Sequence, residues 1–395
     1  MDFYNKALNI KDKLIEIRRD LHEHPELGFE EWRTSGKIKE FLEKEGIEYF
    51  SLAKTGVCGI IKGTGNVGDK EKVIALRADM DGLPIQDKKV CEYKSQEPGK
   101  MHACGHDAHT TILLGAAKLL NENKNLFSGK VKLIFEPAEE TVGGARNMIE
   151  EGVLENPKVD RVLGLHVTED LEKGKIKIKK GVVNAASNPF TIKIKGKGGH
   201  GAAPHSTVDP IVISSQVILA LQVLASREIS PVNPIVITVG AIEGGTAQNI
   251  IPDEVILKGI IRTMAKEDRE YAKRRLEEIV KGITLTMRGD YEIEIEESYP
   301  CLYNDDSMVD LLKNAAKEVI GKDNVIEQPS PSMGVESFAY FAMERPSAFY
   351  FLGAANNEKG INAPAHNAMF DIDEECIPVG VAIQCTAALD YLTSK

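Results

Sequence analysis

Hydrophobic positions along the first part of the chain change from a helical spacing to short runs typical of strands. Ile10, Leu14, Ile17 and Leu21 recur every three or four residues, which predicts an amphipathic helix near the start. The further elements expected in this part are helices at 34–45 and 108–120 and strands at 57–61, 73–76, 131–135 and 162–165. This alternation is typical of an α/β sheet with helices on its faces.

The middle of the chain follows a different order of elements. We expect a strand at 190–195, a helix at 211–224, strands at 235–239 and 255–261, a helix at 266–286 and a strand at 291–295. The order β-α-β-β-α-β predicts a ferredoxin-like α+β domain of roughly 115 residues, inserted at 184–298. Further helices and a strand at 348–352 return the chain to the first domain, which comprises 1–183 and 299–395. Two domains suit a chain of 395 residues, which exceeds what one hydrophobic core usually serves.

Composition excludes several classes of partner. The net charge of −11 disfavours nucleic acid and anionic membranes, because both require clustered Lys and Arg. The basic run 174–180 alternates Lys with Ile, which predicts a strand with one solvated face.

The sequence also bears on the location of the protein. It contains no run of about 18 apolar residues, so we expect no membrane-spanning helix. The first residues lack the apolar segment of a signal peptide, so we expect a cytoplasmic protein. The six cysteines form no CxxC pair, which argues against disulfides and structural zinc fingers and fits a reducing compartment.

Side chains capable of acid–base or metal chemistry follow three of the expected strands. Asp79 follows the strand at 73–76, Glu139 and Glu140 follow 131–135, and His166 follows 162–165. Ligands of open α/β sheets bind outside the carboxyl ends of the strands. The pattern therefore predicts one site at this edge of the sheet.

Two pairs of residues indicate what that site does. Cys104 and His106 stand two residues apart in a loop containing glycine, and a thiolate and an imidazole so spaced can bind one metal ion. A buried free cysteine beside a solvated histidine is the alternative. Glu139 and Glu140 are adjacent, and neighbouring extended residues point in opposite directions. One carboxylate can then bind metal while the other acts as a general base, although two solvated loop acids would give the same sequence.

Three further features are weak when each is taken alone. His166 at a strand end is commonly a hydrogen-bonded structural residue, and His366 lies in a loop that nothing local explains. His109 falls inside the expected helix at 108–120 and fits a supporting or structural role better than that of a ligand. His200 lies between glycines in the inserted domain, where an ordinary tight turn is the simplest interpretation.

Together the motifs resemble the M20 metallopeptidases and, within them, the M20D amidohydrolases. This group includes N-acyl amino acid, hippurate and indole-acetyl amino acid hydrolases and N-acetyl-diaminopimelate deacetylases. The resemblance covers nearly the whole chain and rests on residues 18–22, 25–29, 77–81, 101–107, 137–140, 198–200, 204–205 and 247–252, and on His366. The stretch MHACGHD followed by PAEE is its most specific part.

The resemblance implies a role for each candidate residue. It implies a phosphorylase/hydrolase-like catalytic domain with a mixed sheet flanked by helices, and two divalent metal ions, zinc, manganese or cobalt. The implied ligands are Cys104 as a bridge with His106, Glu140, His166 and His366. Glu139 is the implied general base, Asp79 an acid supporting the site, His200 a residue binding the reacting carbonyl, and Asn249 and Arg262 substrate contacts. Arg77 stands where the wider superfamily has a metal-binding histidine, as is typical of M20D, and Ser337 stands where relatives commonly carry Asp.

The expected function is metal-dependent hydrolysis of the amide bond of N-acyl amino acids or dipeptide-like molecules, of the aminoacylase or carboxypeptidase type. We expect a homodimer or homotetramer, since the resemblance implies pairing through the inserted domain. N-acetyl-diaminopimelate deacetylation is an alternative of the same class. A hydrolase with Cys104 as nucleophile and a non-catalytic binding protein with a structural metal are alternatives of other classes.

Overall fold

The computed structural model describes residues 1–141 and 143–394, and the chain divides into two compact units. Unit 1 comprises Met1–Gly181, Tyr303–Ser330 and Ser337–Lys395, and unit 2 comprises Val182–Leu302 and Pro331–Glu336. The chain crosses between the units within β7 (Gly181–Asn184) and again within β14 (Leu302–Asn304). The short segment Pro331–Glu336 was expected with the first domain. It lies with unit 2 because its backbone bonds to Val183 and Ala185.

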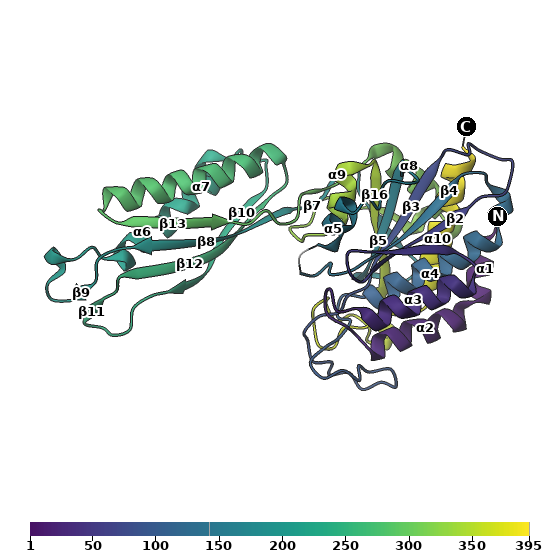
Figure 1. The fold of residues 1–395 in the computed structure, drawn as a ribbon, viewed down its shortest axis with the longest axis horizontal. Coiled ribbons are helices and arrows are strands. Elements are labelled where there is room, and N and C mark those ends of the chain that lie inside the picture. Colours follow the sequence, from purple (N-terminus) through teal and green to yellow (C-terminus); the bar gives the residue numbers. More distant parts are fainter. Residues whose placement is uncertain (142, 395) are drawn as a thin grey trace. The chain divides into compact units, whose positions relative to one another are not determined.

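Unit 1 is built on an eight-stranded mixed sheet (Figure 1). Its strands, in spatial order, are β1 (Glu48–Leu52), β2 (Gly56–Lys62), β4 (Lys130–Glu136), β3 (Val73–Asp79), β5 (Arg161–Glu172), β16 (Ser347–Ala355), β6 (Ile176–Ile178) and β15 (Val325–Glu327). The central strands β4, β3, β5 and β16 run parallel. This mixed α/β sheet confirms the expected fold class. The basic run 174–180 contributes β6, in which Ile176 and Ile178 are buried and Lys177 is partly exposed.

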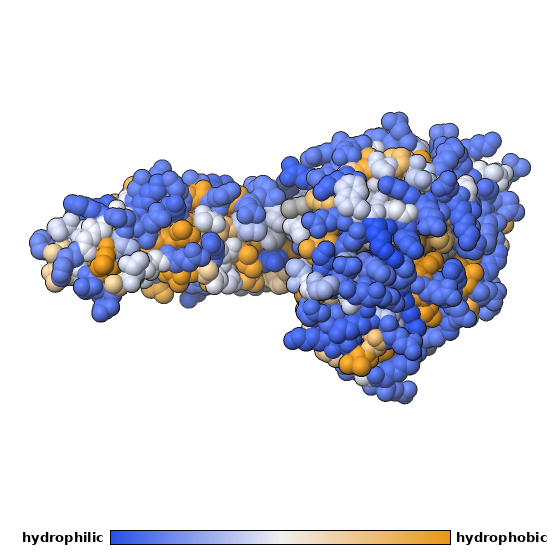
Figure 2. Space-filling view, turned by 60° about the horizontal axis from the view of Figure 1, so that its bottom comes forward, coloured by the Kyte–Doolittle hydropathy of each residue, from blue (hydrophilic) through white to orange (hydrophobic). Residues whose placement is uncertain are grey.

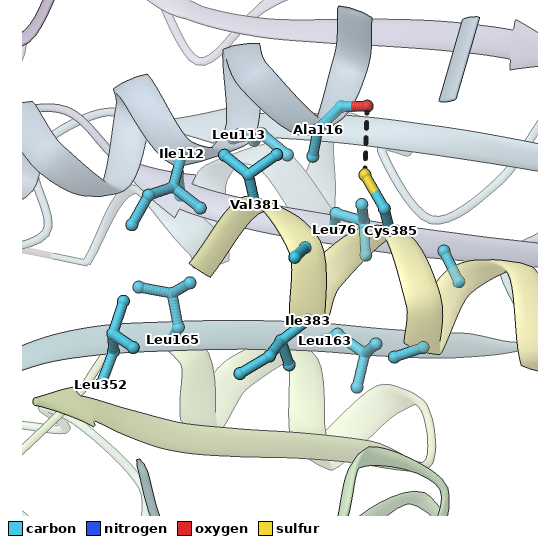
Figure 3. Packing of buried hydrophobic residues seen from close by; sticks show 14 of the residues in the cluster. Leu76, Ile112, Leu113, Ala116, Leu163, Leu165, Leu352, Val381, Ile383 and Cys385 are labelled. Atoms are coloured by element: carbon cyan, nitrogen blue, oxygen red, sulfur yellow. Dashed lines mark hydrogen bonds between the residues drawn. The ribbon is translucent and has the colours of Figure 1, made fainter. Parts of the chain in front are cut away.

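Helices cover both faces of this sheet. Their bounds are α1 (Phe3–Asn9), α2 (Lys11–Glu23), α3 (Trp32–Lys44), α4 (His106–Glu122), α5 (Gly144–Glu150), α8 (Asp306–Ile320), α9 (Phe338–Glu344) and α10 (Cys376–Thr393). Figure 3 shows α10 beside β5, with Leu163 and Leu165 directed toward it. Gly164, between them, points the other way, where an added Cβ would meet the ring of Phe338 in α9. Helices α10 and α9 therefore lie on opposite faces of β5.

Apolar burial explains the composition of α4 and α10. Ile112, Leu113 and Ala116 of α4 meet Val381 and Cys385 of α10 above the sheet (Figure 3). Helix α10 is long and apolar enough to resemble a membrane-spanning segment by composition, but 78% of that window is buried. It is a core helix, which accounts for its lack of a polar face.

Unit 2 is a four-stranded antiparallel sheet with two helices (Figure 1). The strands lie in the order β10 (Ile235–Glu243), β12 (Glu254–Thr263), β8 (Ala186–Lys195) and β13 (Asp290–Ile295). Helices α6 (Pro210–Val223) and α7 (Lys266–Thr286) join them in the expected β-α-β-β-α-β order. Beyond the end of the sheet, β9 (Gly199–His200) pairs with β11 (Ile250–Ile251).

Unit 2 also carries apolar side chains on its surface. Helix α6 buries Ile213, Val217 and Leu221 in the core of the unit. Its exposed apolar residues are Ile211, Val212, Leu219 and Val223. The segment Pro210–Glu228 also has a membrane-like hydropathy, yet only 33% of it is buried. On the face of unit 2 shown in Figure 2, hydrophobic groups reach the surface between hydrophilic ones.

Candidate metal centre

Three parallel strands deliver the predicted residues to one edge of the sheet. Asp79 and Glu136 are direct partners at the ends of β3 and β4, and Arg77 lies opposite Gly164 of β5. The turn after β4 carries Glu139 and Glu140, and His166 lies within β5. Because the strands are parallel, these side chains meet at a single edge, as the sequence pattern predicted.

The loop before α4 brings Cys104 and His106 to the same edge. Gly105 between them adopts a left-handed backbone with φ of 85°, and a Cβ there would lie 2.3 Å from Val167. Only glycine fits this turn, which lets the residues on either side of it face the site. The helix starts at His106, two residues earlier than the hydrophobic pattern predicted, so His106 belongs to its first turn.

All five predicted ligands lie in two overlapping groups. Cys104, His106 and His166 form one group, and Cys104, Glu140 and His366 form the other; the ligand atoms of each group lie within 4.8 Å of one another. The Cys104 Sγ lies 3.3 Å from His166 Nε2, and Glu140 Oε1 lies 3.2 Å from His366 Nε2. The groups share the Cys104 thiol, which would belong to both ligand sets if two ions were bound.

Polar atoms that lack partners support metal binding. His106 Nε2 and Glu140 Oε1 are buried, 3.8 Å apart, and neither makes a hydrogen bond within the described residues. Buried polar atoms without partners are costly unless an ion satisfies them. Sulfur, nitrogen and oxygen donors together suit zinc, manganese or cobalt. The residues present therefore fit two divalent ions.

Electrostatics at these residues follow from burial and proximity. Burial and the nearby Glu140 carboxylate hold the pKa of the Cys104 thiol well above its usual range. Burial alone would raise the pKa of Glu140, but the neighbouring imidazoles of His366 and His106 lower it to about 2. Glu140 is therefore ionised at neutral pH, whereas Cys104 requires a cation to lose its proton.

The turn after β4 corrects one expectation. The sequence predicted that Glu139 and Glu140 point in opposite directions. Residues 139–141 instead form a turn after Ala138, whose φ is 54°, so the backbone is not extended. Oxygens of both carboxylates lie within 4.8 Å of a nitrogen of His106. Both carboxylates therefore face the site, and they differ in partners: Glu139 Oε1 accepts the backbone N–H of Ser337 at 3.0 Å.

Asp79 and His109 connect two of the strands behind the candidate ligands. The Asp79 carboxylate lies 2.5 Å from His109 Nδ1, and His109 Nε2 accepts the backbone N–H of Val167 at 2.9 Å. The acceptor role of Nε2 places the imidazole proton on Nδ1, toward Asp79. His109 thus secures the backbone beside His166 and has no nitrogen left for a metal.

Sequence reasoning missed two groups of supporting residues. Asp81 Oδ1 lies 3.0 Å from His106 Nδ1, and its Oδ2 accepts the backbone N–H of Glu140. Asp107 contacts Arg18 Nε at 2.8 Å and His22 Nδ1 at 2.7 Å, all fully buried. Asp81 comes two residues after Asp79, the last residue of β3, and this spacing was the sequence signal for Asp81. Nothing local indicated that Arg18 and His22 lie beside Asp107.

The remaining predicted residues belong to unit 2. His200 is exposed, and its Nδ1 accepts the backbone N–H of Ala202, which leaves the proton of a neutral ring on Nε2. The Asn249 carbonyl accepts the N–H of Gly201, so these two predicted residues are neighbours. Arg262 lies on β12, paired with Ser187 and Val236, at the opposite end of the sheet. Its Nη1 is buried and has no hydrogen-bond partner among the described residues.

Cys104 is expected to resist alkylation when metal is bound and to react readily after chelation. A metal-bound thiolate is sequestered, whereas removal of the ions opens access to the sulfur. Mass spectrometry after iodoacetamide treatment at pH 8.5, with and without chelator, measures the difference. Cys91, which is partly exposed and belongs to none of the candidate metal-binding groups, provides the control whose rate chelation leaves unchanged. Equal rates at Cys104 in both forms would remove it from the ligand set.

Comparisons with known proteins identify the family of this chain. Residues 75–390 match the model of peptidase family M20/M25/M40. The chain is 42% identical to the IAA-amino acid hydrolase ILR1-like 4 of Arabidopsis thaliana, over 96% of this chain and 86% of that protein. It is 40% identical to the N-acetyl-L-cysteine deacetylase of Bacillus subtilis, over 93% of this chain and 85% of that protein.

A solved structure supports the same family assignment. The YXEP protein of Bacillus subtilis, described as a dinuclear metal-binding peptidase of the M20 family, superposes with a TM-score of 0.83. It is 34% identical and covers 98% of this chain and 99% of its own. The family match and these relatives confirm the resemblance found in the motifs: the chain is a hydrolase that belongs to peptidase family M20/M25/M40.

Proposed function

We propose that this enzyme hydrolyses the amide bond of N-acyl amino acids, with Glu139 as general base. The observation that carries the proposal is the position of Glu139 beside two donor groups that share Cys104. A carboxylate held by a backbone N–H next to a dinuclear donor set is suited to deprotonate an attacking water. Names of the relatives support small acyl–amino acid substrates, and N-acetyl-diaminopimelate is one member of that class.

Each residue then has a defined task. When bound, the two ions at Cys104, His106, Glu140, His166 and His366 lower the pKa of water and polarise the amide carbonyl. Glu139 takes the proton of the attacking water and later donates it to the leaving nitrogen. Asp79 supports the site through His109, as described above.

Unit 2 contributes substrate contacts in this proposal. His200 donates its Nε2–H to the carbonyl oxygen as negative charge develops there. Arg262 provides an unpaired guanidinium nitrogen that suits a carboxylate, and Asn249 provides a polar side chain near His200. Unit 1 is the catalytic unit in this proposal, and unit 2, which contains residues 184–298, serves as a lid and as a dimerisation domain.

We further propose a homodimer, or a homotetramer built from such dimers, in the cytoplasm. Strand β10 is an edge strand of unit 2, and α6 exposes apolar side chains. Large exposed apolar surfaces commonly mark protein interfaces, and open strand edges can pair with a second copy.

A substrate panel tests the proposed function. Metal-free enzyme is supplied with zinc, manganese or cobalt and assayed against N-acetyl, N-benzoyl and indole-acetyl amino acids and against dipeptides. We expect hydrolysis of at least one N-acyl amino acid with added metal and none after chelation. Activity that survives complete metal removal would favour Cys104 as a nucleophile instead. Absence of hydrolysis across the panel with every metal would overturn the proposed substrate class.

A further inference from the structure

Ser337 joins the candidate base to the buried charges behind the site. Its backbone N–H donates to Glu139 Oε1 at 3.0 Å. Its hydroxyl accepts from Arg77 Nη2 at 2.8 Å and donates to Glu136 Oε1 at 2.6 Å. The residue is fully buried. A single serine thus contacts a carboxylate at the reaction site and a charged pair that belongs to the sheet.

The charged pair forms a rigid support for the serine hydroxyl. Arg77 Nε bonds to Glu136 Oε2 at 2.6 Å, and Arg77 Nη1 bonds to Asp79 Oδ2 at 2.8 Å. Glu136 Oε1 also accepts the N–H of Ala145. Arg77 and Glu136 lie on adjacent strands within a buried ladder, so their positions are set by the sheet. Charge-assisted hydrogen bonds of this kind are short and directional.

The hydroxyl and the N–H belong to one residue, so fixing the first also places the second. Anchoring the Ser337 Oγ between Arg77 and Glu136 determines where its N–H points, and that N–H holds one oxygen of Glu139. A carboxylate is planar, so fixing one oxygen restricts the direction of the other. Small displacements of a reacting group can cost roughly 100-fold in rate.

We propose that Ser337 is a positioning residue for Glu139, acting through its hydroxyl anchor on Arg77 and Glu136. The inference rests on the proposed function of Glu139 as general base. It gives a role to Ser337, the position that the sequence analysis marked as a departure from the motif. A hydroxyl both donates and accepts, so it can satisfy Glu136 and Arg77 at once. An ionised Asp would only accept and would add a third carboxylate next to Glu136 and Glu139.

A purely structural role would give a different result from a positioning role. If Ser337 only supported the packing of α9, its loss would lower stability or metal content and would not act selectively on kcat. The matched control is Ser347, another fully buried serine of unit 1, whose hydroxyl donates to the Arg345 carbonyl. Arg345 is not one of the candidate site residues, so this hydroxyl makes its hydrogen bond outside the site.

The test compares Ser337→Ala, Ser337→Thr and Ser347→Ala as metal-loaded enzymes on the best substrate of the panel. We expect Ser337→Ala to keep both ions and a KM within about twofold of wild type, while kcat falls roughly 10- to 100-fold. Ser337→Thr restores the hydroxyl and most of kcat, and Ser347→Ala stays near wild type. If the Ser337→Thr chain fails to fold, the difference in kcat between Ser337→Ala and Ser347→Ala still tests the positioning role.

Two results would overturn the positioning role. One is a Ser337→Ala enzyme with wild-type kcat, and the other is a loss of activity that follows loss of metal or of folded protein. A failure of the proposed function itself would look different. Either the wild-type enzyme would hydrolyse no substrate of the panel, or the Glu139→Gln enzyme would keep full turnover. Neither of those measurements involves residue 337.

Discussion

Replacing Glu139 with Gln is expected to lower kcat at least roughly 10³-fold while both metal ions stay bound, a loss of about 4 kcal/mol of transition-state stabilisation. Gln keeps the size of the side chain and an oxygen that can accept the Ser337 N–H. It cannot take a proton from water, so only the acid–base step is removed. Turnover assays and metal analysis by mass spectrometry on the same sample measure the two effects separately.

Glu140→Gln is the paired variant, because the adjacent carboxylate differs in its partners. Glu140 contacts His366 and lies in the group that contains Cys104, so its loss should reduce bound metal. Glu139→Gln with less metal, together with Glu140→Gln with full metal, would reverse the two assignments. Substantial turnover by a metal-loaded Glu139→Gln enzyme would exclude Glu139 as the base.

Much of the fold and of the donor set could be predicted because its signals are local. Asp79, Glu139–Glu140 and His166 each come soon after a recognisable apolar run, and the parallel topology brings these segments together without further information. The strand that was expected to stop at residue 165 continues to Glu172, so His166 lies within β5. Cys104 and His106 are close in sequence, and glycine between them indicates a sharp turn. The long helix 266–286 was predicted with its observed bounds, since its apolar residues keep helical spacing throughout.

What could not be predicted depends on contacts between distant segments. Ser337 lies 260 positions from Arg77, yet the two share a hydrogen bond. Arg18 and Asp107 likewise meet only through packing of α2 against α4. The predicted direction of the Glu140 side chain was wrong, because the backbone forms a turn there and is not extended as the prediction assumed. Hydrophobic periodicity records which face of an element is buried, but it does not record which distant residue faces it.

The strand register of unit 2 bears on how a substrate could be bound. Along β12, Glu254 pairs with Lys195 and Arg262 pairs with Ser187, and β9 with His200 lies beyond the Lys195 end. Eight residues of strand separate positions 254 and 262, which is roughly 26 Å. An extended dipeptide-sized substrate spans only about 7 Å between its ends. One substrate therefore cannot touch Arg262 and His200 of the same copy.

A dimer removes this difficulty, because each of its two copies can contribute one of the two residues. Arg262 pairs with Ser187, which comes three residues after β7 (Gly181–Asn184), whereas His200 lies beyond the opposite end of the sheet. The homodimer proposed above would let His200 of one copy and Arg262 of the other contact the same substrate. The exposed apolar face of α6 and the open edge of β10 are available for the required pairing.

His200→Ala is expected to lower kcat roughly 100-fold with metal content and folding intact, as loss of an oxyanion donor does. Arg274→Ala, on the exposed surface of α7, is the control that keeps wild-type kcat.

Mixing the His200→Ala and Glu139→Gln enzymes tests whether His200 acts across subunits. Once the two variants have exchanged subunits, activity should return, because each heterodimer contains one intact composite site. Equal amounts give about a quarter of the wild-type activity per chain if exchange is random. Subunit exchange is verified by native mass spectrometry of differently labelled copies. Absence of rescue once heterodimers are present would rule out action across subunits, and a wild-type kcat in His200→Ala would exclude His200 from catalysis altogether.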